Sequence, residues 1–471
     1  MSTHSTPDNK AAGRLRIGVL GHYGNDNLGD EAIVQAVIEN LRGRIPDAEV
    51  VCFSVNPANT AWRHGVPAFA LSRRSQTIAD KWTRAKSRVP SETGSPPAAA
   101  STAGLKAWIK DIPGLRASVR ALRFLASLPG ALIAEGRFIM LSRARLREMD
   151  LLLIAGSNQF LDNFGGVWGF PYAMLKWAWL GRMCGCKVAF VSIGAGPLSS
   201  PVSMLFVRLA MLAAHDVSFR DEASRELATC SWAGQDAKVS PDLAFSLPLD
   251  PPAEDAEAGR PRIGVNPMPV HDRRYWHEAN DQAYSAYVEQ LTSFCAHLES
   301  AGYPWYFYAT QPKDANVMAD VATRLRAQGW SAQNLDEKMF IPQTVDELVS
   351  RIAQTEILVA TRFHGVVLSL MAGRPALGVC YHRKTADVLD KIGLAGFHMH
   401  IDSLDAQALA AMLDKMEGQR IMLQKTVREQ AQRYRFALDE QYDRLLALLP
   451  AARCGGGTQP VAASVADLSA R

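Results

Sequence analysis

The chain has 471 residues and a formal net charge of +4, with 48% hydrophobic and 21% charged residues. These are ordinary values for a globular protein, and the length suggests two or three domains. No apolar run approaches the roughly 20 residues that a membrane-spanning helix needs, and the apolar stretch at 17–21 is too short for the core of a signal peptide. We therefore expect a cytoplasmic protein.

The positive charge is concentrated in one part of the chain. Residues 72–149 contain 15 Lys and Arg against 5 Asp and Glu, whereas the rest of the chain contains 36 and 42. The basic character therefore belongs to an insertion at 72–149 and not to the whole protein, and we expect no nucleic-acid partner. Within this insertion, a stretch rich in Pro, Ser and Ala at 87–102 predicts a flexible linker.

Apolar runs alternate with helical patterns on both sides of this insertion. In the first half we expect strands at 15–20, 50–54, 151–154, 188–193 and 217–219, and helices after residue 30 and at 172–182. In the second half we expect strands at 262–265, 305–308, 357–360 and 376–380, and helices at 283–298, 316–326, 345–352, 364–371, 385–392 and 406–449.

A stretch with several prolines and acids predicts a linker at 249–260 between the two halves. It separates an N-terminal domain at 14–248 from a C-terminal domain at 261–450. The polar residues 1–13 and the low-complexity tail 451–471 are expected to be disordered.

Strands that alternate with helices are typical of parallel sheets with helices on both faces. Two such series joined by a linker predict an α/β protein with two Rossmann-like domains facing a cleft. In such sheets, ligands bind beyond the carboxyl ends of the strands, so the loops at these ends carry the candidate site residues.

Two of these loops belong to the first half. The loop at 21–33 places Asn27, Gly29 and Asp30 before a helix, whose free N–H groups suit an anion. A tight turn with a capping aspartate would explain the same pattern. The second loop begins with Arg220 and Asp221, for which a surface ion pair is the simpler explanation.

The third loop gives the strongest signal. Arg362 and His364 lie between an apolar strand and an apolar helix, so a guanidinium, an imidazole and helix N–H groups would converge where a phosphate or carboxylate could bind. A lone histidine is usually a cap or a core residue, but the Arg-x-His pair at a strand end favours a site. The fourth loop carries Lys384, and a solvated basic loop is its alternative.

The four loops together predict several cations and few metal ligands. The sequence has no Asp-x-Asp pair for a metal-bridged nucleotide diphosphate, no Walker A loop and no Gly-x-Ser-x-Gly elbow. We therefore expect a small, multiply anionic ligand, with neither a metal nor a cofactor.

Several segments resemble the polysaccharide pyruvyl transferase family. They are NLGDEAI at 27–33, SFRDEAS at 218–224, PDLAF at 241–245, TRFHGVVLSLMAGRP at 361–375 and YHRK at 381–384. The resemblance implies a GT-B-like architecture. It also implies transfer of pyruvate from phosphoenolpyruvate to a sugar of a cell-surface or exopolysaccharide precursor, with formation of a pyruvate ketal and release of phosphate.

The resemblance also implies roles for the candidate residues. Arg220 and Arg362 would hold the carboxylate and phosphate of phosphoenolpyruvate, with assistance from Lys384. His364 would be the general acid that protonates C3 of the enol, because imidazole titrates near neutral pH. Further substrate-binding positions are Asn27 and Gly29, and the base for the sugar hydroxyls is left open among Asp30, Asp162 and Asp221.

The sequence departs from the family in two places. Residues 155–157 read AGS where the family usually has three glycines, although Gln159 and Asp162 fit the continuation. This difference leaves the loop geometry or the acceptor open. The insertion at 72–149 is also longer than the family pattern predicts.

Two other functions are left open. A GT-B glycosyltransferase using a nucleotide sugar would share the fold, but many retaining members carry two glutamates eight positions apart, and Glu347 and Glu356 are nine apart. A non-catalytic relative in polysaccharide assembly would fit the altered glycine triplet, but not the retained Arg220, Arg362 and His364.

The acceptor is expected to be a lipid-linked oligosaccharide, which would bring the protein to the inner face of the membrane. Within 115–128, Arg116, Arg120 and Arg123 would form a basic stripe on a helix beside an apolar stripe, as in helices that lie on anionic membranes. A solvated insertion with its arginines outward explains the pattern equally well.

Overall fold

The computed structural model describes residues 14–78, 115–163, 165–229, 237–249, 259–276 and 278–450, with the backbone alone over 115–128. Several expectations lie outside the described residues: the disordered ends, the linker at 87–102, most of the linker at 249–260, and the side chains of Arg116, Arg120 and Arg123.

The first half of the chain forms a parallel sheet in the order β3-β2-β1-β4-β6-β7-β8, and β5 pairs with β6 beside this path. The bounds are β1 Arg16–Leu20, β2 Glu49–Ser54, β3 Ala68–Ala70, β4 Leu151–Ala155, β5 Asn158–Phe160, β6 Lys187–Ala195, β7 Asp216–Phe219 and β8 Lys238–Val239. All five side chains of the central strand β4 are buried. Its unbroken apolar sequence therefore follows from helices covering both faces of the sheet.

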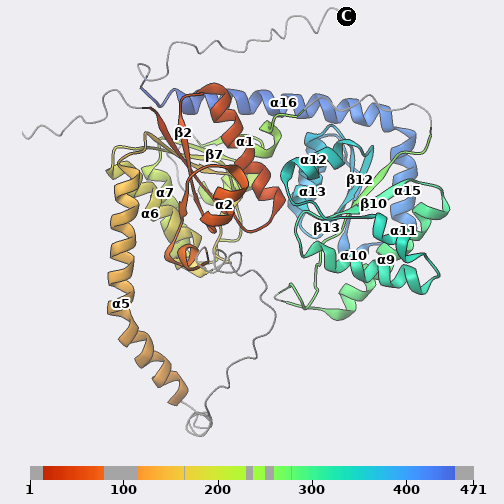
Figure 1. Ribbon diagram of the computed structural model, residues 1–471, viewed down its shortest axis with the longest axis horizontal. Coiled ribbons are helices and arrows are strands. Elements are labelled where there is room, and N and C mark those ends of the chain that lie inside the picture. The colour runs from red at the N-terminus through yellow and green to blue at the C-terminus, as the bar shows by residue number, and fades with distance from the viewer. Residues whose placement is uncertain are drawn as a thin grey trace, which may run out of the picture.

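The helices of this half cover the two faces of the sheet. They are α1 Leu28–Arg44, α2 Pro57–His64, α5 Leu115–Leu146, α6 Phe170–Met183, α7 Pro201–Ala213 and α8 Glu222–Thr229, with short turns η1 Gly166–Trp168 and η2 Leu243–Ser246. Side chains of α1 pack with one face of the sheet, and side chains of α5, α6 and α7 pack with the other. Figure 1 shows α5 extending beyond the rest of the molecule.

The second half forms a parallel sheet in the order β11-β10-β9-β12-β13-β14. The bounds are β9 Ile263–Asn266, β10 Trp305–Tyr308, β11 Met339–Phe340, β12 Ile357–Ala360, β13 Ala376–Cys380 and β14 His398–His400. Its helices are α9 Asp281–Ser300, α10 Asp314–Ala327, α11 Ala332–Glu337, α12 Val345–Ala353, α13 Phe363–Met371 and α14 Arg383–Lys391, with the turn η3 Ile401–Ser403. In both sheets the strand order reverses beside the first strand, which places ligand-binding loops there.

The single final helix expected at 406–449 is wrong, because the chain forms two helices there. They are α15 Ala406–Gly418 and α16 Arg420–Leu446, separated by Gln419 in a non-helical conformation (φ −114°, ψ 9°). Glycine at the end of α15 weakens the helix at this point. The break allows α16 to run back across the molecule to the first half (Figure 1).

Contacts with the first half hold α16 in place. Gln441 Nε2 donates to Ser192 Oγ at 3.1 Å, and the hydroxyls of Tyr442 and Ser246 lie 3.2 Å apart. The apolar cluster that packs α1 on the first sheet continues into the second sheet and α16. The two halves therefore share one core. None of the described helices is both long and apolar enough to cross a membrane.

Candidate functional site

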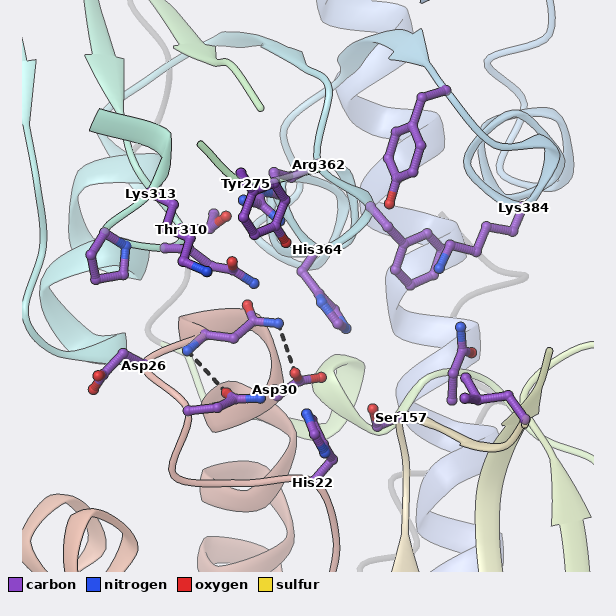
Figure 2. A pocket seen from close by; sticks show the side chains of 18 of the residues that line it. His22, Asp26, Asp30, Ser157, Tyr275, Thr310, Lys313, Arg362, His364 and Lys384 are labelled. Atoms are coloured by element: carbon purple, nitrogen blue, oxygen red, sulfur yellow. Dashed lines mark hydrogen bonds between the residues drawn. The ribbon is translucent and has the colours of Figure 1, made fainter. Parts of the chain in front are cut away.

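A cavity of about 510 Å³ lies between the two sheets. Its walls come from loops that follow β1, β4, β7, β9, β10, β12 and β13, so it lies at the carboxyl ends of both sheets, as expected. Figure 2 shows the labelled side chains of both halves converging on this space. Among the expected site residues, the lining includes Asn27, Asp30, Arg220, Arg362, His364 and Lys384.

The loop after β1 places Asn27 and Asp30. Asn27 caps α1, where its Oδ1 accepts from the Gly29 amide at 3.2 Å. Its Nδ2 donates to Asp30 Oδ2 at 2.7 Å, and Figure 2 marks this bond at the labelled Asp30. The buried carboxylate of Glu31 holds the loop from behind, because it accepts from the Gly24 amide at 2.8 Å and contacts His64 Nε2 at 2.8 Å. Helix capping and ligand contact are thus compatible at Asn27.

Gly29 contributes space to the site. It does not line the cavity, and a Cβ atom at this position would lie 2.3 Å from Cβ and Cγ of His364. The absence of a side chain therefore lets α1 approach α13 closely enough for His364 to enter the cavity.

His364 lies in the first turn of α13 and points toward Asp30 and His22 in Figure 2. Its Nε2 is buried and has no hydrogen-bonding partner among the described residues. Burial lowers the pKa of His364; the nearby Asp30 carboxylate opposes this effect, and Lys384 reinforces it. The lowered pKa therefore favours the neutral imidazole at neutral pH.

Arg362 is held by a carboxylate. Its Nε donates to Asp314 Oδ1 at 2.9 Å, and its terminal nitrogen Nη2 contacts the same oxygen. The other Asp314 oxygen accepts from the amides of Thr310 and Gln311, both at 3.0 Å. Although burial opposes the charge, Asp314 raises the pKa of Arg362 above its ordinary value. Arg362 is thus a fixed cation at the cavity wall.

Arg220 is also surrounded by acceptors. Its Nη2 donates to Asn158 Oδ1, and its guanidinium lies 3.5 Å from carboxylate oxygens of both Asp242 and Asp221. A Cβ atom at Gly194 would lie 2.6 Å from Arg220 Nη2, so this glycine makes room for the guanidinium. Asp221 does not line the cavity and also caps α8, where it accepts from the Ser224 amide at 2.7 Å.

Lys384 and Arg220 lie against the same aromatic ring. Nζ of Lys384 lies 5.0 Å, and Cζ of Arg220 lies 4.9 Å, from the centre of the Phe363 ring. These are cation–π distances. Burial, followed by the charge of Arg220, lowers the pKa of Lys384 to about 8. Sequence reasoning missed Phe363, although it stands between Arg362 and His364.

Asp162 does not line the cavity. Its carboxylate accepts from the amides of Ser199 at 3.2 Å and Ser200 at 2.9 Å, at the start of α7. Burial opposes ionisation of Asp162, but these backbone hydrogen bonds lower its pKa. Of the three candidate bases, Asp30 alone lines the cavity, whereas Asp162 and Asp221 hold loops beside it.

The altered glycine triplet forms a tight turn at the cavity wall. Gly156 and Ser157 both have positive φ, 57° and 59°. Gln159 Nε2 donates to the carbonyls of Ala155 at 3.0 Å and Gly156 at 2.9 Å, which closes the turn. Serine therefore adopts the left-handed conformation that glycine adopts more easily, and its side chain lines the cavity.

The loops after β9 and β10 were not expected from the sequence. Tyr275 lies 5.6 Å from the Arg362 guanidinium, measured to the ring centre, and Lys313 Nζ lies 4.6 Å from the same ring. The rule that ligands bind at the carboxyl ends of strands applied to these loops too, because both strands had been predicted. Among the described residues, no group of three or more His, Cys, Asp or Glu side chains is arranged to hold a metal ion.

The sequence matches the model of the polysaccharide pyruvyl transferase family over residues 27–383. This range covers most of the chain and includes Arg220, Arg362 and His364. The chain therefore belongs to the polysaccharide pyruvyl transferase family. No curated protein matches its sequence.

Solved structures share the fold at low sequence identity. A candidate UDP-N-acetylglucosamine 2-epimerase of Listeria monocytogenes has a TM-score of 0.50 at 9% identity, with 92% of this chain and 96% of that chain covered. An alpha,alpha-trehalose-phosphate synthase (UDP-forming) of Burkholderia vietnamiensis has a TM-score of 0.48 at 14% identity, with 94% and 99% covered. HepE of Anabaena, in complex with UDP and glucose, has a TM-score of 0.48 at 12% identity, with 92% and 99% covered. The two parallel sheets and the first of these similarities confirm the predicted GT-B-like architecture of two Rossmann-like domains.

Proposed function

We propose that the cavity binds phosphoenolpyruvate and that the protein transfers its pyruvate to a sugar of a cell-surface or exopolysaccharide precursor, as a ketal. The observation that carries this proposal is the convergence of Arg220, Arg362 and Lys384 on the cavity that contains His364. Three cations in a partly enclosed space suit a ligand with both a carboxylate and a phosphate. Family membership supports the same reaction class.

The proposed chemistry assigns a proton donor and fixed charges. His364, once protonated, donates its proton to C3 of the enol, which makes C2 electrophilic. One sugar hydroxyl adds to C2 and loses its proton to a base, for which Asp30 is the candidate that lines the cavity. The C2–O bond to phosphate then breaks, and the departing phosphate takes the proton from Asp30. A second hydroxyl adds to C2, closes the ketal and returns a proton to His364. Arg220 and Arg362 stabilise the departing phosphate.

The test uses mass spectrometry of lipid-linked glycans incubated with phosphoenolpyruvate or with a nucleotide sugar. A gain of one pyruvyl ketal with phosphoenolpyruvate, lost in His364→Asn, supports the proposal. Transfer of a sugar from the nucleotide sugar, without ketal formation, would replace it with the glycosyltransferase alternative. No transfer from either donor would favour a non-catalytic role.

We also propose where the acceptor binds. A groove of about 230 Å³ shares Asp26, Thr310, Gln311 and Pro312 with the cavity, and its far end contains Trp62, which is 56% exposed. An exposed indole can stack on the apolar face of a sugar ring. The Arg63 guanidinium, which lies 5.4 Å from the Trp62 ring and 3.1 Å from Asp26, packs beside the indole.

The acceptor groove makes a separate prediction. Trp62→Ala should raise KM for the sugar acceptor about tenfold or more, because stacking is lost, and leave the affinity for phosphoenolpyruvate unchanged. Exposed Phe436 on α16 provides the matched control, since Phe436→Ala removes a similar surface area away from the groove. Equal KM values for both variants and the parent would show that the acceptor does not bind in this groove.

We propose finally that the acceptor is an oligosaccharide carried on a lipid and that the reaction takes place at the cytoplasmic face of the membrane. Family membership supports a saccharide acceptor.

A further inference from the structure

Exposed apolar side chains gather on one layer of helices. Of 17 large hydrophobic residues that are exposed in the described part of the chain, ten lie on α5, α6, α7 and the turn η1. Scattered single exposures would not concentrate in this way. The ten residues on this layer are Leu132, Ile133, Met140, Leu141, Trp168, Trp179, Met183, Val202, Leu205 and Leu212, each at least 39% exposed.

Hydrogen bonds join these helices into one continuous layer. Lys176 Nζ on α6 contacts Glu135 Oε1 on α5 at 2.9 Å. On its other side, α6 contacts α7, because Trp179 Nε1 donates to the Leu209 carbonyl at 2.9 Å. The layer covers the face of the first sheet opposite α1. Figure 1 shows it on the side of the molecule away from the second sheet. The outer sides of the three helices therefore form a single surface, which we call the α5–α7 surface.

Helix α7 is apolar on both sides. Val207 and Met211 face the core, whereas Leu205 and Leu212 face outward. A helix that covers a sheet normally carries polar residues on its outer side. The outward apolar residues of α7 thus indicate contact with something other than water.

The charge of the α5–α7 surface is positive. The sequence has no Asp or Glu between residues 163 and 215. Arg137, Arg143, Arg147 and Arg182 are exposed, while Glu135 is engaged by Lys176 and by Arg73. This surface combines arginines and exposed apolar side chains with few acidic residues. Such a combination suits a partner that is apolar inside and anionic at its surface.

We infer that the α5–α7 surface docks on an anionic lipid bilayer, with its apolar side chains in the interfacial layer and its arginines at the headgroups. A second copy of this chain is the less suitable partner, because self-association through this surface would bring the arginines of the two copies close together, where their charges repel. The docking surface includes α6 and α7 and so extends well beyond the basic insertion. It does not depend on the reaction catalysed in the cavity.

The test measures co-sedimentation of the full chain with vesicles of phosphatidylglycerol and phosphatidylcholine, compared with phosphatidylcholine alone. We expect binding to the anionic vesicles that weakens as salt rises. The apolar variant Ile133→Ser/Met140→Ser/Leu205→Ser and the charge variant Arg137→Glu/Arg143→Glu/Arg147→Glu should each weaken binding about tenfold or more. All six positions are exposed, so both variants should fold.

Matched controls lie on α16, away from the α5–α7 surface. Ile421→Ser/Met422→Ser/Phe436→Ser removes equally exposed apolar side chains, and Lys425→Glu/Arg433→Glu reverses exposed charges. Both controls should bind as the parent does. If the parent stays in the supernatant at low salt, or if the controls weaken binding as much as the test variants, the inference is overturned. A dimer that dissociates in the apolar variant, without vesicle binding by the parent, would assign the surface to a second copy.

Discussion

The nitrogen-bearing side chains of the cavity differ in how firmly the protein holds them. Arg362 is tied to Asp314, and Arg220 is surrounded by Asn158, Asp221 and Asp242. These two guanidiniums are fixed charges. His364 Nε2 has no hydrogen-bonding partner among the described residues, and Lys384 Nζ lies against the Phe363 ring; burial lowers both pKa values. The cavity thus combines permanent cations with two groups whose protonation can respond to a ligand.

Donor binding should cause proton uptake at His364. Burial lowers the pKa of the imidazole and favours its neutral form, whereas an anionic ligand nearby favours the charged form. We expect isothermal titration calorimetry with phosphoenolpyruvate at pH 7, in buffers of different ionisation enthalpy, to report net proton uptake. His364→Asn should remove most of this uptake and lower turnover by about 10²–10⁴-fold, with a smaller change in donor affinity.

The control for this experiment is His22→Asn, since His22 lines the same cavity. It should keep the proton uptake. Undiminished uptake in His364→Asn, or near-normal turnover of that folded variant, would show that His364 is not the acid.

Donor affinity should depend on the charge of Lys384. Its pKa is lowered to about 8, chiefly by burial, so the ammonium is present below pH 8 and is lost above it. We expect the Kd for phosphoenolpyruvate to rise about tenfold per pH unit above this value, because the cationic form binds the anion. Lys384→Arg should bind with a flatter profile to higher pH, whereas Lys384→Met should bind weakly at every pH. A flat profile in the parent would contradict a role for Lys384 in donor binding.

At the scale of elements, the turn at 155–157 closes the wall of the cavity. Ser157 has φ 59°, a conformation that costs roughly 1–2 kcal/mol for residues other than glycine. Ser157→Gly should therefore stabilise the protein by about 0.5–1 kcal/mol after the entropy of the unfolded chain is included, as measured by urea unfolding.

Gly156→Ala is the opposing control. It combines φ 57° with a Cβ atom 2.5 Å from Ile33 Cγ2, so it should lower stability clearly. If Ser157→Gly instead destabilises the protein, the serine hydroxyl holds the turn, and the glycine of the family pattern is not equivalent here.

At the scale of the whole molecule, two features join the halves. The Leu28 amide donates to the Thr310 carbonyl at 2.9 Å beside the cavity, and α16 carries Leu438 and Tyr442 into the shared core. A core that continues through both sheets should make them unfold together. We therefore expect one calorimetric transition, with equal calorimetric and van't Hoff enthalpies.

Leu438→Ala tests this coupling. Leu438 is fully buried, so its truncation should cost about 2–5 kcal/mol and lower the melting temperature of both sheets together, as read by hydrogen exchange of β4 and β12. Phe436→Ala, on the exposed side of the same helix, should change stability little. Loss of protection in one sheet alone would show that the halves unfold independently.

The longer strands were the most predictable part of the fold, whereas the strands of two or three residues, β3, β5, β8, β11 and β14, were missed. Those expected at 305–308, 357–360 and 376–380 have the observed bounds, because each is a short apolar run between polar or turn residues. Helix α7 was missed, since its sequence is apolar on both sides and has no clear helical period. The break at Gln419 was missed because it depends on where α16 must go to cover the first half.

By itself, the sequence determined the α/β class with two parallel sheets, the family, and the cations of the cavity, since strand ends and basic residues are local features. Only the tertiary structure decided which residues contact these side chains. Asp314 binds Arg362, the Phe363 ring contacts both Arg220 and Lys384, and Gly29 makes room for His364. It also showed that Asp162 and Asp221 accept hydrogen bonds from backbone amides and are not among the residues that line the cavity. The physical reason is that these contacts join segments far apart in the chain, and their distances depend on how two separately built sheets pack against each other.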